Sequence, residues 1–406
     1  FWRIEGGLAF RAESRMLGPI LPNGAAEMTV FSFATATEIR FGRGEGSRAM
    51  PALAALGQRV LLVHGANATR ADWLRDGLVR QGCDVSSFAV PGEPDLPMIE
   101  AGLHQARAKG VQAVIALGGG AVIDAGKALA ALVPATRPVL EHLEVVGQGL
   151  PLDASPLPFA ALPTTAGTGA EVTRNAVIAV PDAQRKVSLR DARMLPRMAI
   201  VDSALTDGCP RAVTLASGLD AITQVIEPYI STRANPLTDS LTLPRIAPAL
   251  TALDRLMHGD DPAARDEMAL TSLCGGLALA NAGLGVVHGL AGPLGGLSNA
   301  AHGALCGVML PHGLVANAAG ASGAALDRIT RVQTEIGHAL GVAAPDAFRA
   351  LAEWARQAGL PGLDAQGVTA AHRAEAARMA ATSSSMKANP VALDEDSLAR
   401  IMEDAR

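Results

Sequence analysis

The sequence predicts an α/β domain built on a parallel sheet, followed by an all-helical domain. In the first half, short β-branched runs alternate with segments of helical periodicity, the order that βαβ units require. After Cys209 and Pro210 the chain becomes rich in Ala and Leu and shows no convincing strand. A chain of 406 residues gives each half room for its own core. We therefore expect an α/β dinucleotide-binding domain over 28–208 and an all-helical domain over 209–406.

The expected strands of the first half are short apolar runs. The run 59–64 (RVLLVH) lies between Gly57 and Gly65, which suits a strand buried on both faces. Further strands are expected at 86–90, 111–117, 159–162 and 198–202, and helices at 72–81, 96–109 and 122–132. In the second half, periodicity predicts helices at 213–231, 236–256, 262–284, from 313 onward, 325–340, 345–358 and 370–382.

Composition and charge argue against several classes of partner. The net charge is −5 and no stripe of Lys and Arg is present, so nucleic acid is not an expected partner. The most apolar stretch, 111–133, is interrupted by Asp124 and Lys127, so we expect no membrane span. Four cysteines without a CxxC pair are typical of a reduced, cytoplasmic protein. Residues 1–27 lack any periodicity, and we interpret them as a non-native or disordered extension, with Met28 as the natural start.

A glycine triplet, Gly118, Gly119 and Gly120, stands between an expected strand and an expected helix. Glycine lets a backbone approach a phosphate closely, and the N-terminus of a helix offers free N–H groups. A tight strand-to-helix turn would also require glycine. The triplet alone fits both interpretations equally, because it is not the GxGxxG fingerprint.

Three hydroxyl side chains, Thr164, Thr165 and Thr168, alternate with glycines in the segment PTTAGTGAEVT at 163–173. They could border a nucleotide crevice. On composition alone, an ordinary Thr- and Gly-rich loop is the favoured interpretation.

A possible metal site comes from the helical half. Asp220 and Gln224 are four residues apart, so their side chains share one helix face. His288, His302 and His312 are each followed by Gly. One Asp and two His form a plausible set of ligands for a divalent ion, although single histidines in a helical domain are more often core residues.

Five motifs occur in one order: GGGxxxD, PTTxGTGxEV, GLDAxTxxIEPY, HGLAxPLGG and AHGxxCxxxLPH. Together they resemble the iron-containing (group III) alcohol dehydrogenase family, from about Thr29 to the C-terminus. The resemblance implies a dehydroquinate synthase-like fold, in which an α/β domain binds NAD(P) and a helical domain follows. It also implies a divalent metal, iron or zinc, in the cleft between the domains, and a cytoplasmic homodimer.

The resemblance also assigns roles to individual residues. The glycine triplet would hold the pyrophosphate, and the three threonines would border the adenine and nicotinamide portions. Lys186 would reach the nicotinamide ribose, and Asp124 ends the GGGxxxD motif of the cofactor site. The four family positions for metal ligands are occupied by Asp220, Gln224, His288 and His302.

The chain departs from the family pattern at several positions. Gln224 stands where the family usually has His, so a neutral amide oxygen replaces an imidazole. Gly292 stands where a second His usually serves as a proton relay, and Ala121 and Ala170 replace family serines. We therefore expect a weakly bound metal, with Gln224 in or near its ligand shell, and a proton path through water or a ribose hydroxyl.

The leading hypothesis is an NAD(P)-dependent oxidoreductase that interconverts a small alcohol and its aldehyde or ketone. One alternative is a keto-acid reductase like maleylacetate reductase, for which Arg174 and Arg233 are candidate carboxylate ligands. A sugar-phosphate cyclase is disfavoured, because the segment 217–317 is poor in Lys and Arg. A third alternative is a nucleotide-binding homologue that has lost catalysis.

Cofactor preference depends on Gly65. The family usually has a carboxylate at this position, where it would bond the ribose 2′-hydroxyl and repel a 2′-phosphate. Gly65 leaves room for that phosphate, and Arg70 could reach it, although an exposed arginine at a helix start is the favoured interpretation of Arg70. We therefore expect NADP(H) to be accepted at least as well as NAD(H).

Overall fold

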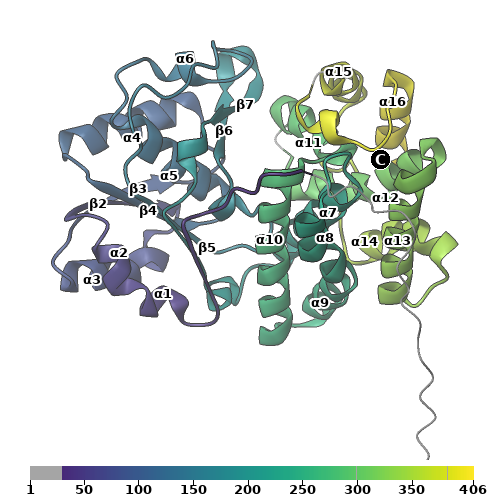
Figure 1. Ribbon diagram of the computed structural model, residues 1–406, viewed down its shortest axis with the longest axis horizontal. Helices are drawn as coiled ribbons and strands as arrows, with labels where there is room; N and C mark the ends of the chain where they lie inside the picture. Colours follow the sequence, from purple (N-terminus) through teal and green to yellow (C-terminus); the bar gives the residue numbers. More distant parts are fainter. Residues whose placement is uncertain (1–29, 299, 382) are drawn as a thin grey trace, which may run out of the picture. The chain divides into compact units, whose positions relative to one another are not determined.

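The computed structural model describes residues 30–298, 300–381 and 383–406. Phe33–Arg406 form one compact unit (Figure 1). The extension that we expected over residues 1–27 lies outside the described residues.

Within the described residues, six parallel strands form one sheet in the order β1-β8-β5-β4-β2-β3. Their bounds are β1 (Glu38–Phe41), β2 (Arg59–Gly65), β3 (Asp84–Val90), β4 (Ala113–Gly118), β5 (Phe159–Pro163) and β8 (Met198–Val201). The expected α/β domain with a parallel sheet is therefore confirmed. The strand β1 was not expected, because it is a four-residue edge strand (EIRF) with no buried residue.

Helices cover both faces of this sheet because successive strand residues point to opposite sides. Val60 and Leu62 of β2 pack on the side of α2 (Met50–Ala54) and α3 (Asp72–Arg80). Leu61 and Val63 pack on the side of α4 (Leu96–Ala108) and α5 (Gly120–Leu132). Both faces of β2 are thus apolar, as the uninterrupted run RVLLVH predicted.

The first half also contains an antiparallel hairpin that the sequence did not lead us to expect. Its strands are β6 (Asn175–Val180) and β7 (Arg185–Arg190). Every second residue of β6 is buried, and Ala176 and Ile178 belong to the same core cluster as α5. The turn includes Gln184 in the left-handed region, at φ +50°. The first half is therefore a mixed α/β structure.

The second half is helical, as expected. Its helices are α7 (Arg211–Ile230), α8 (Pro236–Thr242), α9 (Ile246–His258), α10 (Pro262–Ala282), α11 (Val286–Leu297), α12 (His302–Gly320), α13 (Gly323–Leu340), α14 (Ala347–Gln357), α15 (Ala370–Ala380) and α16 (Glu395–Asp404). The single helix expected over 236–256 is two helices, because a 3₁₀ turn at Leu243–Arg245, which contains Pro244, separates α8 from α9. The helices α11 and α16 were not expected.

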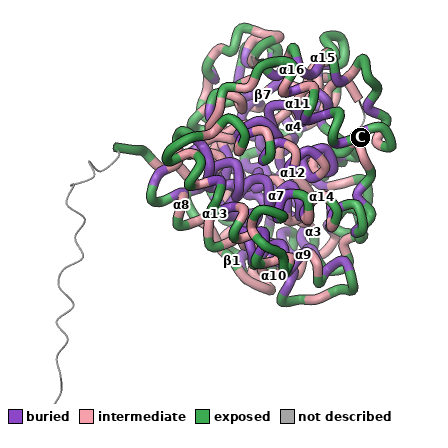
Figure 2. The backbone as a smooth tube through the Cα atoms, turned by 90° about the vertical axis from the view of Figure 1, so that its right-hand side faces the viewer, coloured by how far each residue is buried: buried purple, intermediate pink, exposed green. Residues whose placement is uncertain are grey.

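The helix α7 is the centre of the helical half. It contacts α8, α9, α10, α12 and α13, and all residues from 218 to 230 are buried. Figure 2 shows α7 in the middle of the view, where much of the backbone is buried. Among the described helices, none is by itself long and apolar enough to cross a membrane; α10 and α11 pass that test only as a pair, with a bend of 98° between them.

Candidate functional site

The carboxyl ends of β2, β4 and β5 lie side by side, because neighbouring strands of the sheet are parallel. In an open α/β sheet, ligands bind at this edge. A cavity of about 500 Å³ opens there, and its lining includes Gly65, Arg70, Gly118, Gly119 and Thr164. The structure thus brings together five residues that the sequence suggested for the cofactor site.

The glycine triplet forms the start of α5, with Gly119 as its N-cap residue. A Cβ on Gly118 would lie 2.5 Å from Cβ of Val122, and a Cβ on Gly120 would lie 2.6 Å from Cγ2 of Thr168. Glycine is therefore required at both positions for close packing of the backbone. The N-terminus of this 13-residue helix also lies next to the cavity, where its free N–H groups could meet a phosphate, so phosphate binding by the triplet stays a prediction.

The three threonines play different roles in the structure. Thr164 lines the cavity, and its backbone N–H donates to the Gly118 carbonyl at 3.0 Å. Thr165 and Thr168 pack against the positions where Gly119 and Gly120 would carry a Cβ. This loop therefore supports the start of α5 as well as bordering the cavity.

Neither Asp124 nor Lys186 lines this cavity. Oδ2 of Asp124 accepts a hydrogen bond from the Val177 backbone N–H at 3.0 Å, which joins α5 to β6, and burial raises the pKa of Asp124 to about 6. Nζ of Lys186 lies 3.7 Å from Oε2 of Glu93 and 3.5 Å from the Cβ position of Gly295 on α11. Lys186 thus reaches from the hairpin to the helix that carries His288.

The candidate metal centre joins three helices. Asp220 comes from α7, His288 from α11, and His302 and Cys306 from the first turns of α12. One ligand atom from each of these four residues lies within 4.8 Å of the other three. Nε2 of His288 is 3.3 Å from Oδ1 of Asp220, and Nε2 of His302 is 4.0 Å from the same oxygen. The third His–Gly residue, His312, is not part of this group of the described residues.

Glu227 orients His288. Its Oε2 lies 2.7 Å from Nδ1 of His288, and its Oε1 accepts a hydrogen bond from the Val287 backbone N–H at 2.7 Å. This contact leaves Nε2 of His288 directed at Asp220, which is the arrangement of a carboxylate–histidine–metal triad. The sequence analysis missed Glu227 and Cys306. Spacing could have found them, since Glu227 follows Asp220 by seven residues and Cys306 follows His302 by four, both on one helix face.

Gln224 connects the candidate metal centre to the loop that carries Thr164, Thr165 and Thr168, here called the threonine loop. Its Nε2 donates to the Gly167 carbonyl at 3.1 Å, which identifies Oε1 as the free amide oxygen. Among the described residues, Oε1 of Gln224 and Oδ1 of Asp220 are buried without a hydrogen-bond partner. Buried polar atoms are normally satisfied, so these two acceptors fit a site that receives a cation.

The charges of the group also fit a cation. Burial opposes ionisation of Asp220, but the neighbouring His288, at 3.3 Å, and the charge of His302 hold its pKa below the usual value. Interaction with Cys306 raises the pKa of His302 to about 9, and contacts with Cys306, Asp220 and Glu227 raise the pKa of His288 despite its burial. The surroundings of the two histidines thus favour a positive charge, which a bound cation would also supply.

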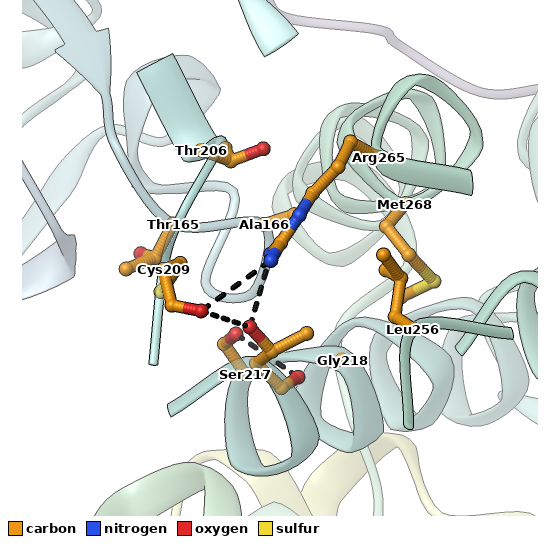
Figure 3. A pocket seen from close by; sticks show the side chains of 10 residues that line it. Thr165, Ala166, Thr206, Cys209, Ser217, Gly218, Leu256, Arg265 and Met268 are labelled. Carbon is orange, nitrogen blue, oxygen red and sulfur yellow. Dashed lines mark hydrogen bonds between the residues drawn. The ribbon is translucent and has the colours of Figure 1, made fainter. Parts of the chain in front are cut away.

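A second, smaller space lies where the threonine loop meets α7, α9 and α10 (Figure 3). The guanidinium of Arg265 donates there to Oγ1 of Thr214 at 3.0 Å and to the Cys209 carbonyl at 3.3 Å. The space measures about 10 Å³, which is at most enough for one water molecule. It is a small gap in the packing between α10 and the start of α7, and it is too small for a substrate.

Comparison with known proteins identifies the family. Residues 36–203 match the family described as "Iron-containing alcohol dehydrogenase", and residues 214–406 match its C-terminal family. The chain is 38% identical over 251 residues to "Probable alcohol dehydrogenase EutG" of Escherichia coli K12, covering 61% of this chain and 62% of EutG. It is 33% identical over 297 residues to 4-hydroxybutyrate dehydrogenase of Cupriavidus necator, covering 71% of this chain and 76% of that protein.

A solved structure supports the same assignment. The crystal structure of a 1,3-propanediol oxidoreductase superposes with a TM-score of 0.84 at 28% identity, covering 93% of this chain and 100% of that one. The match to EutG spans about three fifths of that relative's length. The predicted resemblance is confirmed, and the chain belongs to the iron-containing alcohol dehydrogenase family.

Proposed function

We propose that this protein is an NAD(P)-dependent oxidoreductase that interconverts a small alcohol and its aldehyde or ketone at a divalent metal. One observation carries the proposal: an Asp/His/His group, in which Asp220 and His288 are buried and His302 is partly exposed, lies beside the loop that borders the nucleotide cavity. The hydrogen bond from Gln224 to the Gly167 carbonyl is the direct link between them. The names of the relatives, an alcohol dehydrogenase and a 4-hydroxybutyrate dehydrogenase, support this reaction class.

The protein's own residues would bind and orient the reactants. Asp220, His288 and His302 would hold the metal, and Glu227 would fix the imidazole of His288. A bound metal would supply Lewis-acid polarisation of the substrate oxygen, and a bound nicotinamide would supply the hydride chemistry. The start of α5 and the threonine loop would fix the dinucleotide so that its reactive end faces the metal centre.

The proton needs a path without a histidine at position 292. A Cβ on Gly292 would meet nothing within 4 Å, so the position is open space. Water in this space, or a ribose hydroxyl of the bound cofactor, would carry the proton. Gly65 and Arg70 favour acceptance of NADP(H), and a cytoplasmic homodimer with iron or zinc completes the proposal.

A catalytically impaired nucleotide-binding homologue is the second candidate. Gln224 and Gly292 favour it, because each replaces a histidine that the family usually has. Both candidates predict nucleotide binding, and only the oxidoreductase predicts turnover.

The test uses the purified full-length protein, with metal analysis and reduced-nicotinamide absorbance against a panel of small aldehydes. We expect turnover that falls on exhaustive chelation and returns with added metal. His288→Ala should abolish both metal binding and turnover, whereas His258→Ala, a change of a largely exposed side chain on α9, should leave both unchanged. Full activity after chelation, with a metal analysis that finds no metal, would refute the proposed metal dependence. Nucleotide binding without turnover would favour the catalytically impaired homologue.

A further inference from the structure

Cys306 lies within the candidate metal centre, although the family resemblance assigns it no role. Its side chain is fully buried, and its Sγ lies 3.6 Å from Nε2 of His302. The two residues are separated by one helical turn at the start of α12, so both side chains point to the same side. Cys306 is one of the four residues whose ligand atoms lie within 4.8 Å of one another.

The distances agree with a tetrahedral ion. Zinc–ligand bonds of about 2.0–2.1 Å to N and O and about 2.3 Å to S imply edges of roughly 3.3 Å between N and O and roughly 3.6 Å between N and S. The edge from His288 Nε2 to Asp220 Oδ1 is 3.3 Å, and the edge from His302 Nε2 to Cys306 Sγ is 3.6 Å. The edge from His302 Nε2 to Asp220 Oδ1 is longer, at 4.0 Å, so His302 has to move closer to Asp220 for the group to close around an ion.

Gln224 is the weaker candidate for the fourth ligand. Its amide is neutral, and its Nε2 is held by the Gly167 carbonyl. A thiolate is anionic and soft, so it binds zinc and similar ions more strongly than an amide oxygen does. With Asp220 it would also balance the two positive charges of the ion.

We propose that Cys306 is a metal ligand of this protein, and that its thiolate, with Asp220, His288 and His302, takes the place of the imidazole that the family usually has at position 224. The inference rests on the proposed metal site. On metal binding, the Cys306 thiol loses its proton to solvent and Sγ bonds to the ion. The ligand set of one S, two N and one O favours zinc over iron, because thiolate ligands select softer ions.

Cobalt(II) spectroscopy tests this ligand without any measurement of activity. The metal-free full-length protein is titrated with Co²⁺, and bound cobalt is counted after gel filtration. We expect one cobalt per chain and an intense thiolate-to-cobalt charge-transfer band in the near ultraviolet. The band should disappear in Cys306→Ser and remain in Gln224→Ala. It should also remain in the control variant Cys83→Ser, whose thiol belongs to a core cluster of the first half.

Each outcome decides the matter. One bound cobalt without the band, or a band that persists in Cys306→Ser, overturns the role of Cys306 and leaves the metal site standing. No cobalt bound by the wild-type protein overturns the metal site itself, and the ligand with it. If Cys306→Ser fails to fold, a variant in which Cys83, Cys209 and Cys274 are all replaced by Ser should keep the band, and loss of the band there would overturn the role of Cys306. As a second readout, the affinity of folded Cys306→Ser for Zn²⁺, measured by competition with a chelator, should fall more than its affinity for Fe²⁺.

Discussion

Replacing Gly65 with Asp should move cofactor preference from NADP(H) to NAD(H). Gly65 ends β2 and lines the cavity of about 500 Å³, and a Cβ there would meet nothing within 4 Å. The new carboxylate can therefore be accommodated without displacing its neighbours. Its repulsion of a 2′-phosphate is about 2 kcal/mol at a partly hydrated site, and its hydrogen bond to a 2′-hydroxyl adds about 1 kcal/mol. A sum of about 3 kcal/mol corresponds to a roughly hundredfold change in the ratio of kcat/KM values.

Arg70 supplies the complementary perturbation. It lines the same cavity, and no ion pair of Arg70 occurs among the described residues, whereas the nearby Asp72 pairs with Arg75 at 2.8 Å. The guanidinium is therefore available to a phosphate. Charge-assisted hydrogen bonds contribute about 1.5–3 kcal/mol, so Arg70→Ala should lower kcat/KM for NADP(H) about tenfold or more and change that for NAD(H) little.

The assay is the initial rate with one aldehyde and each reduced cofactor in turn. The control is Gly259→Asp, which adds the same charge at the end of α9, where a Cβ also meets nothing within 4 Å. It should leave the cofactor ratio unchanged. A wild-type preference for NAD(H) above tenfold, about 1.4 kcal/mol, would refute the reasoning, as would an unchanged ratio in Gly65→Asp.

Three further changes test other parts of the structure. Glu227→Gln should weaken metal affinity by about tenfold to hundredfold in a chelator competition, because the neutral amide orients the histidine ligand less well; unchanged affinity would contradict that role. Burial raises the pKa of Glu171 from its ordinary 4.5 to about 7, so the stability that is present below pH 4.5 is lost as the pH rises from there to about 7. Relative to Glu171→Gln, the wild-type free energy of unfolding in urea should therefore fall by about 3 kcal/mol between pH 4.5 and 8, and parallel pH curves for the two proteins would exclude this effect. Gly169→Ala should lower the free energy of unfolding by about 2–4 kcal/mol in thermal unfolding, because Gly169 has φ +58° and its Cβ would lie 2.7 Å from the Gly276 backbone nitrogen. The control Gly208→Ala, at φ +66° with open space around it, should lower that free energy by only about 1 kcal/mol, and equal losses of stability would rule out the clash.

The sequence was most informative where one physical requirement dominates a segment. The central strands β2 and β4 are buried on both faces, and an uninterrupted apolar run between glycines is the pattern that such a strand requires. The shared face of Asp220 and Gln224 followed from helical spacing alone. The hairpin β6–β7 was missed because β6 (NAVIAV) is apolar on both of its faces, so alternation is visible only in its burial.

The helix α11 was missed for a different reason. Its sequence, VVHGLAGPLGGL, contains four glycines and an internal proline, which all lower helix propensity. Tertiary packing overrides this cost, because Val287, Leu290 and Leu294 are fully or nearly fully buried against the helical core. Helical spacing puts Cys306 on the face of His302 and Glu227 on the face of Asp220, but it does not show which residues of those faces meet, because that depends on the approach of three helices and so on the whole core.

The threonine loop is attached to the helical half at two points, one of them at residue 224 beside the candidate metal centre, and this attachment gives the change at position 224 a physical meaning. The Gln224 amide donates to the Gly167 carbonyl, and Gly169 packs directly on Gly276 of α10. An amide can hold that carbonyl through Nε2 without being a ligand, whereas an imidazole that binds a metal through one nitrogen has only the other for such a contact. In this protein, the side chain of Gln224 thus serves mainly to connect the two halves, through its hydrogen bond to the Gly167 carbonyl. The negative charge that the ion requires then has to come from elsewhere in the group, and the thiol of Cys306 is the group within reach that can supply it.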